Sequence, residues 1–576
     1  MELIKNLKFA WKYSKGQKLN LIIFILCNLL RIAISILTPI LSAKIIIELT
    51  TNNYTQIILI ALVIFVVEAL SNFFNYVERR CSLTIYRKTL SLLETDLARN
   101  VLKLENECLD EHGSGVFIQR LTNDTSRLSD VFNSVLSMIS ELIRYIGILV
   151  AIFIVNKLIF IYVIGMIVIL SFLEKVRTTK HNEDDKIARK ASEKATGFIG
   201  ELVRGARDIK MLNSENDFIT ELSGKIDEAN YLRMKKSKSS WKYRLYMWEF
   251  RSLCNFILII LLVLMMKENI IVPSIALVLY NYSGSVTGFT NLIGNFLEYI
   301  KDFNLSCERI YDILKDEKFK QEKFGTIHLD KVHGDFEFKD VTFGYNDKMI
   351  LKTLNFKIEA NSTVAFVGKS GTGKTTIFNL LCKMYDINSG KITIDGVDIK
   401  QLDKDSIRGN ITVISQNPYI FNMSIRDNLR LVKADLTDIE MKKACKMACL
   451  DDYIKELPEG YDTIIGEGGV NLSGGQKQRL AIARALVQKT EIILFDEATS
   501  ALDNETQDKI QKAIENMKNE YTILIIAHRL STVINSDKIM LLDNGKIEAA
   551  GTHKELLKTS EKYRSLYETE LLDDNK

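Results

Sequence analysis

A glycine-rich octapeptide at residues 368–375 carries the clearest chemical signal in this sequence of 576 residues. It reads GKSGTGKT, which fits the pattern G-x-x-x-x-G-K-[ST]. A β-branched run, TVAFV, precedes it, and a helical pattern starts at Thr375. Glycines let backbone amides curl round phosphate groups, and the start of a helix adds partial positive charge. The octapeptide therefore predicts a polyphosphate-binding loop between a strand and a helix.

Two residues of this loop have the side chains that a nucleotide and its metal need. We expect Lys374 to reach the β- and γ-phosphates and Thr375 to ligate Mg²⁺. The predicted nucleotide contacts in and beside the loop are Gly368, Lys369, Ser370, Gly371, Thr372, Gly373, Lys374, Thr375 and Thr376.

Two adjacent carboxylates follow a second apolar run, EIILF, which starts at residue 491. Asp496 is expected to hold Mg²⁺, directly or through water, and Glu497 to polarise the attacking water. Such a pair at a strand end is often only a loop cap. The phosphate loop upstream favours the catalytic interpretation.

A second candidate anion site is the pentapeptide LSGGQ at residues 472–476. A serine and two glycines entering a helix place backbone amides at its positive end. The predicted contacts are Ser473, Gly474, Gly475 and Gln476. A plain N-cap with flexible glycines is the alternative, but the position just before Asp496 and Glu497 favours a ligand site.

These motifs need a scaffold, and the two halves of the chain predict different ones. Beyond a charged stretch at residues 315–325, short β-branched runs alternate with helical patterns, which is typical of an α/β domain. Before it lie six apolar stretches, and a membrane span needs about 20 residues. The predicted spans are residues 19–49, 55–77, 131–155, 158–173, 252–266 and 270–290.

The connections between these spans alternate in charge. The two long ones, residues 78–130 and 174–251, are rich in Lys and Arg, which places them and the N terminus in the cytosol. Their helical patterns predict two hairpins that extend beyond the membrane, with a turn at residues 112–115 in the first. Amphipathic loops without a coupling role are the alternative.

Four charged residues lie about midway along predicted spans: Arg31, Glu68, Glu141 and Arg144. Charges within a membrane are costly, so they usually serve a purpose. One hypothesis is a buried cluster facing a central substrate cavity, and the other is a structural ion pair that locks helices together. The sequence leaves both open.

The motifs together resemble the nucleotide-binding domain of ATP-binding cassette (ABC) proteins, and the whole chain is similar to bacterial ABC half-exporters. In that family LSGGQ completes the ATP site of the opposite subunit. The resemblance implies that Tyr345 stacks on adenine, Gln416 contacts Mg²⁺, Asp503 belongs to the D-loop and His528 contacts the γ-phosphate. One departure is Gly468, where the family usually has a basic residue.

The resemblance implies a multi-domain fold. An all-α membrane domain of six transmembrane helices with long cytoplasmic extensions precedes an α/β P-loop ATPase domain. The expected divisions are an amphipathic elbow at residues 1–18, the membrane domain at 19–314, a linker at 315–334 and the nucleotide-binding domain at 335–576.

The expected function is ATP-driven efflux or flipping of an amphipathic drug, lipid or peptide by alternating access. ATP and Mg²⁺ are the expected cofactors, and a second half-transporter, identical or different, is the expected partner. An importer on the same fold and an ATP-gated sensor remain alternatives, and the substrate is not readable from the sequence.

Composition limits the other classes of function. The net charge of +4 is too small to predict nucleic-acid binding, and its Lys and Arg excess suits loops that face a negative inner leaflet. None of the eight cysteines has metal-ligand spacing. Abundant Lys, Ile and Asn suggest a low-GC bacterium, and hence a plasma membrane with the N terminus and nucleotide domain in the cytoplasm.

Overall fold

The structure is a computed structural model that describes residues 2–50, 53–315, 318–346, 348–415, 418–466, 469–488, 490–496, 504–527 and 533–574. The chain forms two compact units. The helical unit comprises Met1–Lys103 and His112–Phe319, and the α/β unit comprises Leu104–Glu111 and Lys320–Lys576. The short segment Leu104–Glu111 therefore belongs to the α/β unit, although the residues on either side of it belong to the helical unit.

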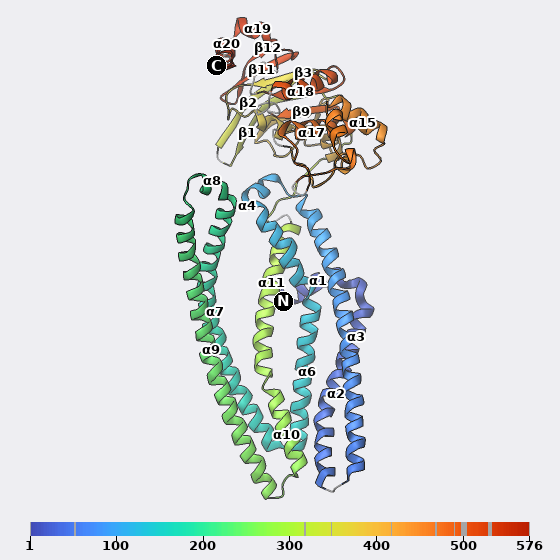
Figure 1. The fold of residues 1–576 in the computed structure, drawn as a ribbon, viewed down its shortest axis with the longest axis vertical. Helices are drawn as coiled ribbons and strands as arrows, with labels where there is room; N and C mark the ends of the chain where they lie inside the picture. The colour runs from blue at the N-terminus through green and yellow to red at the C-terminus, as the bar shows by residue number, and fades with distance from the viewer. Residues whose placement is uncertain are drawn as a thin grey trace. The chain divides into compact units, whose positions relative to one another are not determined.

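The helical unit is built from long helices that pack side by side (Figure 1). Their bounds are α1 Glu2–Ser14, α2 Lys18–Thr50, α3 Tyr54–Val101, α6 Val131–Val155, α7 Lys157–Arg204, α9 Glu215–Lys267, α10 Pro273–Val286 and α11 Phe289–Leu314. The shorter α4 Asn106–Gln119, α5 Thr125–Ser129 and α8 Ala206–Met211 join them. Within the described residues, five helices are long and apolar enough to span a membrane. These five contain the first five predicted spans.

The helices of the predicted hairpins are much longer than a membrane is thick. α3 and α7 have 48 residues each and α9 has 53. At 1.5 Å per residue, 48 residues extend about 70 Å, more than twice the ~30 Å hydrocarbon thickness. The predicted turn of the first hairpin is present, because Gly113 interrupts α4 with φ 67° and ψ 158°. The long helical extensions are thus confirmed.

The sixth predicted span, residues 270–290, is helical but interrupted. Pro273 starts α10, which ends at Val286, and α11 begins at Phe289. The intervening Gly288 packs against Tyr145, because a Cβ at Gly288 would lie 2.4 Å from the tyrosine hydroxyl oxygen. The break leaves two separate helices where the apolar pattern predicted one.

Two sheets form the centre of the α/β unit. The first is antiparallel, with the order β2-β1-β4-β5, and consists of β1 Phe336–Tyr345, β2 Lys348–Ile358, β4 Ser389–Ile394 and β5 Val397–Asp398. The second has the order β12-β11-β3-β10-β9-β6 and consists of β3 Thr363–Val367, β6 Ile411–Ile414, β9 Ile492–Asp496, β10 Thr522–Ile526, β11 Lys538–Asp543 and β12 Lys546–Gly551. Its strands are parallel except β12.

Helices and short elements surround these sheets. They are α12 Lys374–Leu381, α13 Lys404–Arg408, β7 Met423–Ser424, α14 Ile425–Arg430, α15 Asp438–Met447, α16 Asp451–Glu456, β8 Ile464–Ile465, α17 Gly474–Gln488, α18 Asn504–Met517, α19 His553–Thr559 and α20 Glu561–Asp574.

The parallel strands are apolar throughout because both faces of the sheet are covered. Val364 and Phe366 of β3 belong to one hydrophobic core, whereas Ala365 and Val367 belong to the other. Successive side chains of a strand point to opposite faces, so one short run contributes to both cores. This double burial fixes the end of β3, from which the phosphate loop departs.

Candidate nucleotide site

The phosphate loop leaves β3 along a path that requires glycine at two positions. Gly368 has φ 149°, and a Cβ there would lie 2.2 Å from the carbonyl oxygen of Leu542. Gly373, which precedes α12, has φ 104°, and a Cβ there would lie 2.7 Å from Leu351 Cδ2. Side chains at these positions would be strained and would clash. The two glycines therefore hold the loop close against the sheet.

Lys374 is the first residue of α12 and is 5% exposed. Its ammonium donates hydrogen bonds to the carbonyl oxygens of Gly368 at 2.9 Å and Lys369 at 3.0 Å. The side chain therefore folds back over the loop that carries it. A cation fixed there, beside the amides of a helix start, is suited to phosphate oxygens.

Thr375 and Asp496 are separated by 121 residues and meet in the fold, with Thr375 Oγ1 donating to Asp496 Oδ1 at 3.0 Å. Thr375 lies in the first turn of α12, and Asp496 is the last residue of β9. A hydroxyl and a carboxylate are the hard oxygen ligands that Mg²⁺ prefers. Among the described residues no group of three His, Cys, Asp or Glu is placed to hold a metal. Phosphate oxygens and water would have to complete the coordination.

The parallel strands end together at this edge of the sheet. Ile526, at the end of β10, is in register with Phe366 of β3 and with Asp496 of β9. Ligands of open α/β sheets bind outside the carboxyl ends of the strands. The predicted residues Glu497, His528, Gln416 and Asp503 lie outside the described part of the chain.

Tyr345 ends β1 within a cluster of aromatic rings. It makes edge-to-face contacts with Phe343 at 4.9 Å and Tyr385 at 5.1 Å between ring centroids. Its hydroxyl accepts a hydrogen bond from Asn379 of α12 at 3.3 Å. These contacts attach the aromatic residue predicted to stack on adenine to the helix that starts at the phosphate loop.

The second predicted anion site begins α17. Ser473 and Gln476 cap each other: the Ser473 amide donates to Gln476 Oε1 at 2.8 Å, and the Gln476 amide donates to Ser473 Oγ at 3.3 Å. Both Ser473 and Gly474 are exposed. The N-cap that the sequence offered as an alternative is therefore present, and it presents the first turn of α17 to the surface.

Comparison with known proteins supports the assignment of a nucleotide site to this part of the chain. Family models described as ABC transporter transmembrane region and ABC transporter match residues 21–288 and 351–500. The chain is 30% identical over 579 residues to an uncharacterized ABC transporter ATP-binding protein, YfiC, of Bacillus subtilis (strain 168), covering 98% of this chain and 94% of that protein. It is also 30% identical over 589 residues to an ATP-dependent lipid A-core flippase of Pasteurella multocida (strain Pm70), covering 98% of each.

The chain belongs to the ABC transporter family. Because one transmembrane region and one ATPase domain are fused, it is a half-exporter that couples ATP hydrolysis to transport. The membrane-spanning helices make this ABC transporter a membrane protein.

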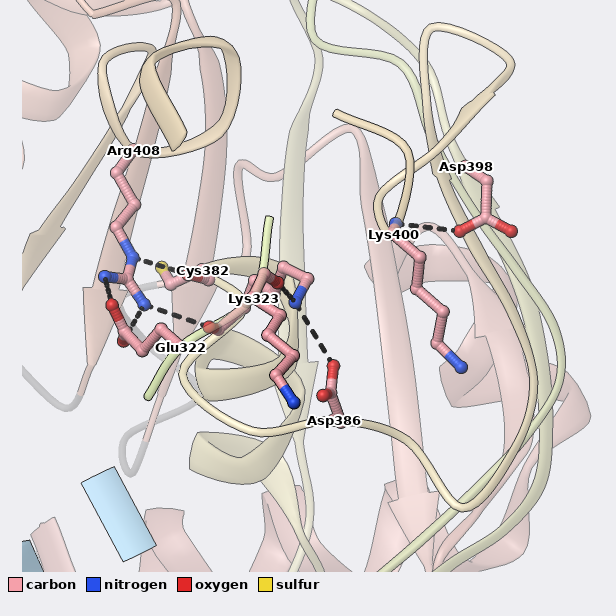
Figure 2. A network of polar contacts seen from close by, with 8 residues as sticks. Glu322, Lys323, Cys382, Asp386, Asp398, Lys400 and Arg408 are labelled. Atoms are coloured by element: carbon pink, nitrogen blue, oxygen red, sulfur yellow. Dashed lines mark hydrogen bonds and ion pairs between the residues drawn. The ribbon is translucent and has the colours of Figure 1, made fainter. Parts of the chain in front are cut away.

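The far end of α12 in this ABC transporter is held by contacts that sequence reasoning missed (Figure 2). Arg408 donates to the carbonyl oxygens of Cys382 at 3.0 Å and Lys383 at 2.9 Å, just beyond the helix end, and pairs with Glu322. Lys383 in turn donates to the carbonyl of Lys323 at 2.5 Å. Burial raises the pKa of the Cys382 thiol to about 12. A single Arg at the end of the short helix α13 gives no sequence signal for this role.

The mid-span charges of the ABC transporter do not form the single cluster that was one hypothesis. Arg31 of α2 forms an ion pair with Glu78 of α3, not with Glu68, which is exposed. Glu141 and Arg144 pair within α6, with Arg144 Nε 3.1 Å from Glu141 Oε2. Arg31 also donates to Asn75 of α3 at 3.1 Å, so both of its contacts lie farther along α3 than Glu68.

Proposed function

We propose that two half-exporters pair and that each ATP is held between the phosphate loop of one chain and residues 472–476 of the other. Lys374 binds the phosphates, Thr375, Asp496 and Gln416 hold Mg²⁺, and Glu497 activates the attacking water, with His528 at the γ-phosphate. The remaining contacts predicted from the sequence complete this site.

The exposed start of α17 is the observation that carries the proposal. The first amides of a helix have no partners within it. Within the described part of the chain, Ser473 caps the amide of Gln476 alone, so the glycine turn between them remains suited to a further anion. Its surface position allows the phosphates to come from a second subunit.

ATP binding then favours the paired state, and hydrolysis releases it. The difference in ATP affinity between the two states supplies the work of alternating access. The substrate is an amphipathic molecule, a drug, lipid or peptide, that leaves the cytoplasmic side of a bacterial plasma membrane.

Transport into inside-out vesicles tests the direction. With ATP outside, an exporter accumulates substrate in the lumen, and a Glu497→Gln variant binds ATP without accumulation. An importer would empty preloaded vesicles, and an ATP-gated sensor would hydrolyse ATP without moving substrate. Either of the last two results would overturn the proposal.

A further inference from the structure

The helical unit contains a cavity of about 360 Å³ between α7, α9 and the break that separates α10 from α11. Its charged lining residues are Glu174, Arg177, Arg244 and Arg251. Trp248 and Asn291 also line it. The sequence did not single out the charged residues or Trp248, and the nucleotide site uses none of these side chains.

The single acid in this cavity is already neutralised. Glu174 and Arg177 form a two-point ion pair, with Nε–Oε2 at 2.8 Å and Nη2–Oε1 at 2.5 Å. Arg177 also donates to Ser240 at 3.2 Å. Three arginines against one glutamate leave two positive charges, which are those of Arg244 and Arg251.

Those two arginines lie on one face of α9. Arg244, Trp248 and Arg251 follow the i, i+4, i+7 spacing of a single helical stripe. Arg251 donates to the carbonyl of Gly284 in α10 at 3.2 Å, and Arg244 lies over the Trp241 ring at 5.4 Å from its centroid. In the described part of the chain neither arginine forms an ion pair with a carboxylate.

The position of the cavity along the helices suits a membrane interface. Arg251 comes directly before the apolar stretch at residues 252–266, and Arg177 follows the stretch at 158–173. The long connecting segments that adjoin these ends are rich in Lys and Arg, so Arg177 and Arg251 lie at the cytoplasmic ends of the two stretches. The arginines therefore lie at the depth of inner-leaflet head groups, with apolar helix surface beyond them.

We propose that this cavity binds the anionic head group, phosphate or carboxylate, of an amphipathic molecule. Arg244 and Arg251 contact the anion, Asn291 at the start of α11 adds a polar contact, and Trp248 packs against the apolar part. The inference rests on the proposed export function and narrows its substrate class from amphipathic to anionic amphipathic. A planar guanidinium binds phosphate and carboxylate oxygens in pairs, which favours these head groups over neutral ones.

Trp248 provides a direct measurement in the full-length transporter. The chain has three tryptophans, so Trp11→Phe with Trp241→Phe leaves Trp248 as the only one. In phosphatidylcholine nanodiscs, phosphatidylglycerol with brominated chains should quench its fluorescence at a mole fraction at least ~10-fold lower than brominated phosphatidylcholine, which corresponds to one charged contact. Equal quenching by the two lipids would overturn the proposal.

Substitutions separate this site from general attraction to a charged surface. Arg244→Gln with Arg251→Gln should remove the preference for quenching by brominated phosphatidylglycerol. Arg244→Lys with Arg251→Lys should retain most of that preference. Arg79→Gln with Arg80→Gln is the matched control, because both residues are exposed just beyond the second apolar stretch and outside the cavity. If this control also lost the preference for phosphatidylglycerol, the preference would come from general attraction to the charged surface, and the proposal would be overturned. Elution as a folded species is checked for every variant.

Soluble glycerol phosphate distinguishes the two sources of anion. Relief of quenching at millimolar concentration shows that the head group alone is recognised, whereas no relief assigns recognition to a lipid already in the membrane. Both results support an anion site. The fluorescence measurement needs no ATP and no transport, so an importer or a sensor would contradict the proposed function without changing this result.

Discussion

Arg408 holds Glu322 with both terminal nitrogens of its guanidinium, at 2.8 Å and 2.6 Å, while its Nε donates to the carbonyl of Cys382 (Figure 2). Glu322 lies in the segment that follows α11, and Cys382 caps the end of α12. The helix that starts at the phosphate loop is thereby tied to the segment through which the membrane helices continue into the ATPase domain. A shift of α12 on nucleotide binding would therefore move Arg408 and, through it, Glu322.

Breaking the Arg408–Glu322 ion pair should weaken the coupling between substrate binding and ATP hydrolysis more than it lowers the basal rate of hydrolysis. Arg408→Ala leaves Glu322 buried without its partner, since that side chain is only 10% exposed, and should cost roughly 3 kcal/mol of stability. Substrate stimulation of ATPase activity should fall several-fold, and Arg408→Lys should restore only part of it. In a double-mutant cycle, Arg408→Met with Glu322→Leu should be more stable than either single variant. Additive losses would contradict a direct pair.

Lys374→Ala should lower ATP hydrolysis by a factor of at least ~100, because a buried cation at the transferring phosphate acts mainly in the transition state. Lys352→Ala removes an exposed lysine of the same unit and serves as the control. Phosphate release by the purified transporter measures both. Normal turnover in Lys374→Ala would rule out the loop as the phosphate site.

The Thr375–Asp496 pair predicts a dependence on metal concentration. Asp496→Asn removes a charged ligand, so half-maximal ATPase activity should need at least ~10-fold more Mg²⁺. Thr375→Ser keeps the hydroxyl and should behave nearly as the parent, whereas Thr375→Ala should resemble Asp496→Asn. A Mg²⁺ titration that is identical in all four proteins would place the metal elsewhere.

Mixed dimers test whether each ATP site uses both chains. One chain carries Lys374→Ala and the other Ser473→Glu, each with its own purification tag. If the sites are shared between chains, both defects fall in one site and the other stays intact. The mixed dimer should then trap about half the ATP of the parent, whereas sites within single chains would trap almost none.

Burial predicts which cysteines react and how stability changes with pH. Burial raises the pKa of the Cys382 and Cys445 thiols to about 12, whereas Cys449 is only partly buried. A maleimide at pH 7.5 should label Cys449 first, and Cys449→Ser should remove the fast phase.

Because the folded-state pKa is raised, the stabilising effect of the two buried thiols is complete below their unfolded pKa near 8.5 and declines as pH rises toward 12. Thermal unfolding of Cys382→Ala should therefore lose part of its alkaline sensitivity, and an unchanged pH profile would contradict this.

Local features of the chain were predictable because they depend on neighbours in sequence. The strand, loop and helix around Gly368, Gly373 and Lys374 follow from residue types at fixed spacing. Apolar length likewise predicted the membrane helices, and the helical patterns of the charged connections predicted their extensions. The interruption of the sixth helix was missed, because hydropathy does not report the packing of Gly288 against Tyr145.

Contacts between distant residues depended on tertiary structure. Hydropathy placed Arg31 and Glu68 about midway along their predicted spans, but it did not identify the partner of either charge. The packing of α2 against α3 decides that Arg31 pairs with Glu78, which lies just beyond the second predicted span. The pairing of Arg408 with Glu322 likewise required the folded sheets, since nothing within either segment identifies the other. The sequence determined which local structures form and which chemistry they can support, whereas the packing of helices and strands decided which distant charges meet.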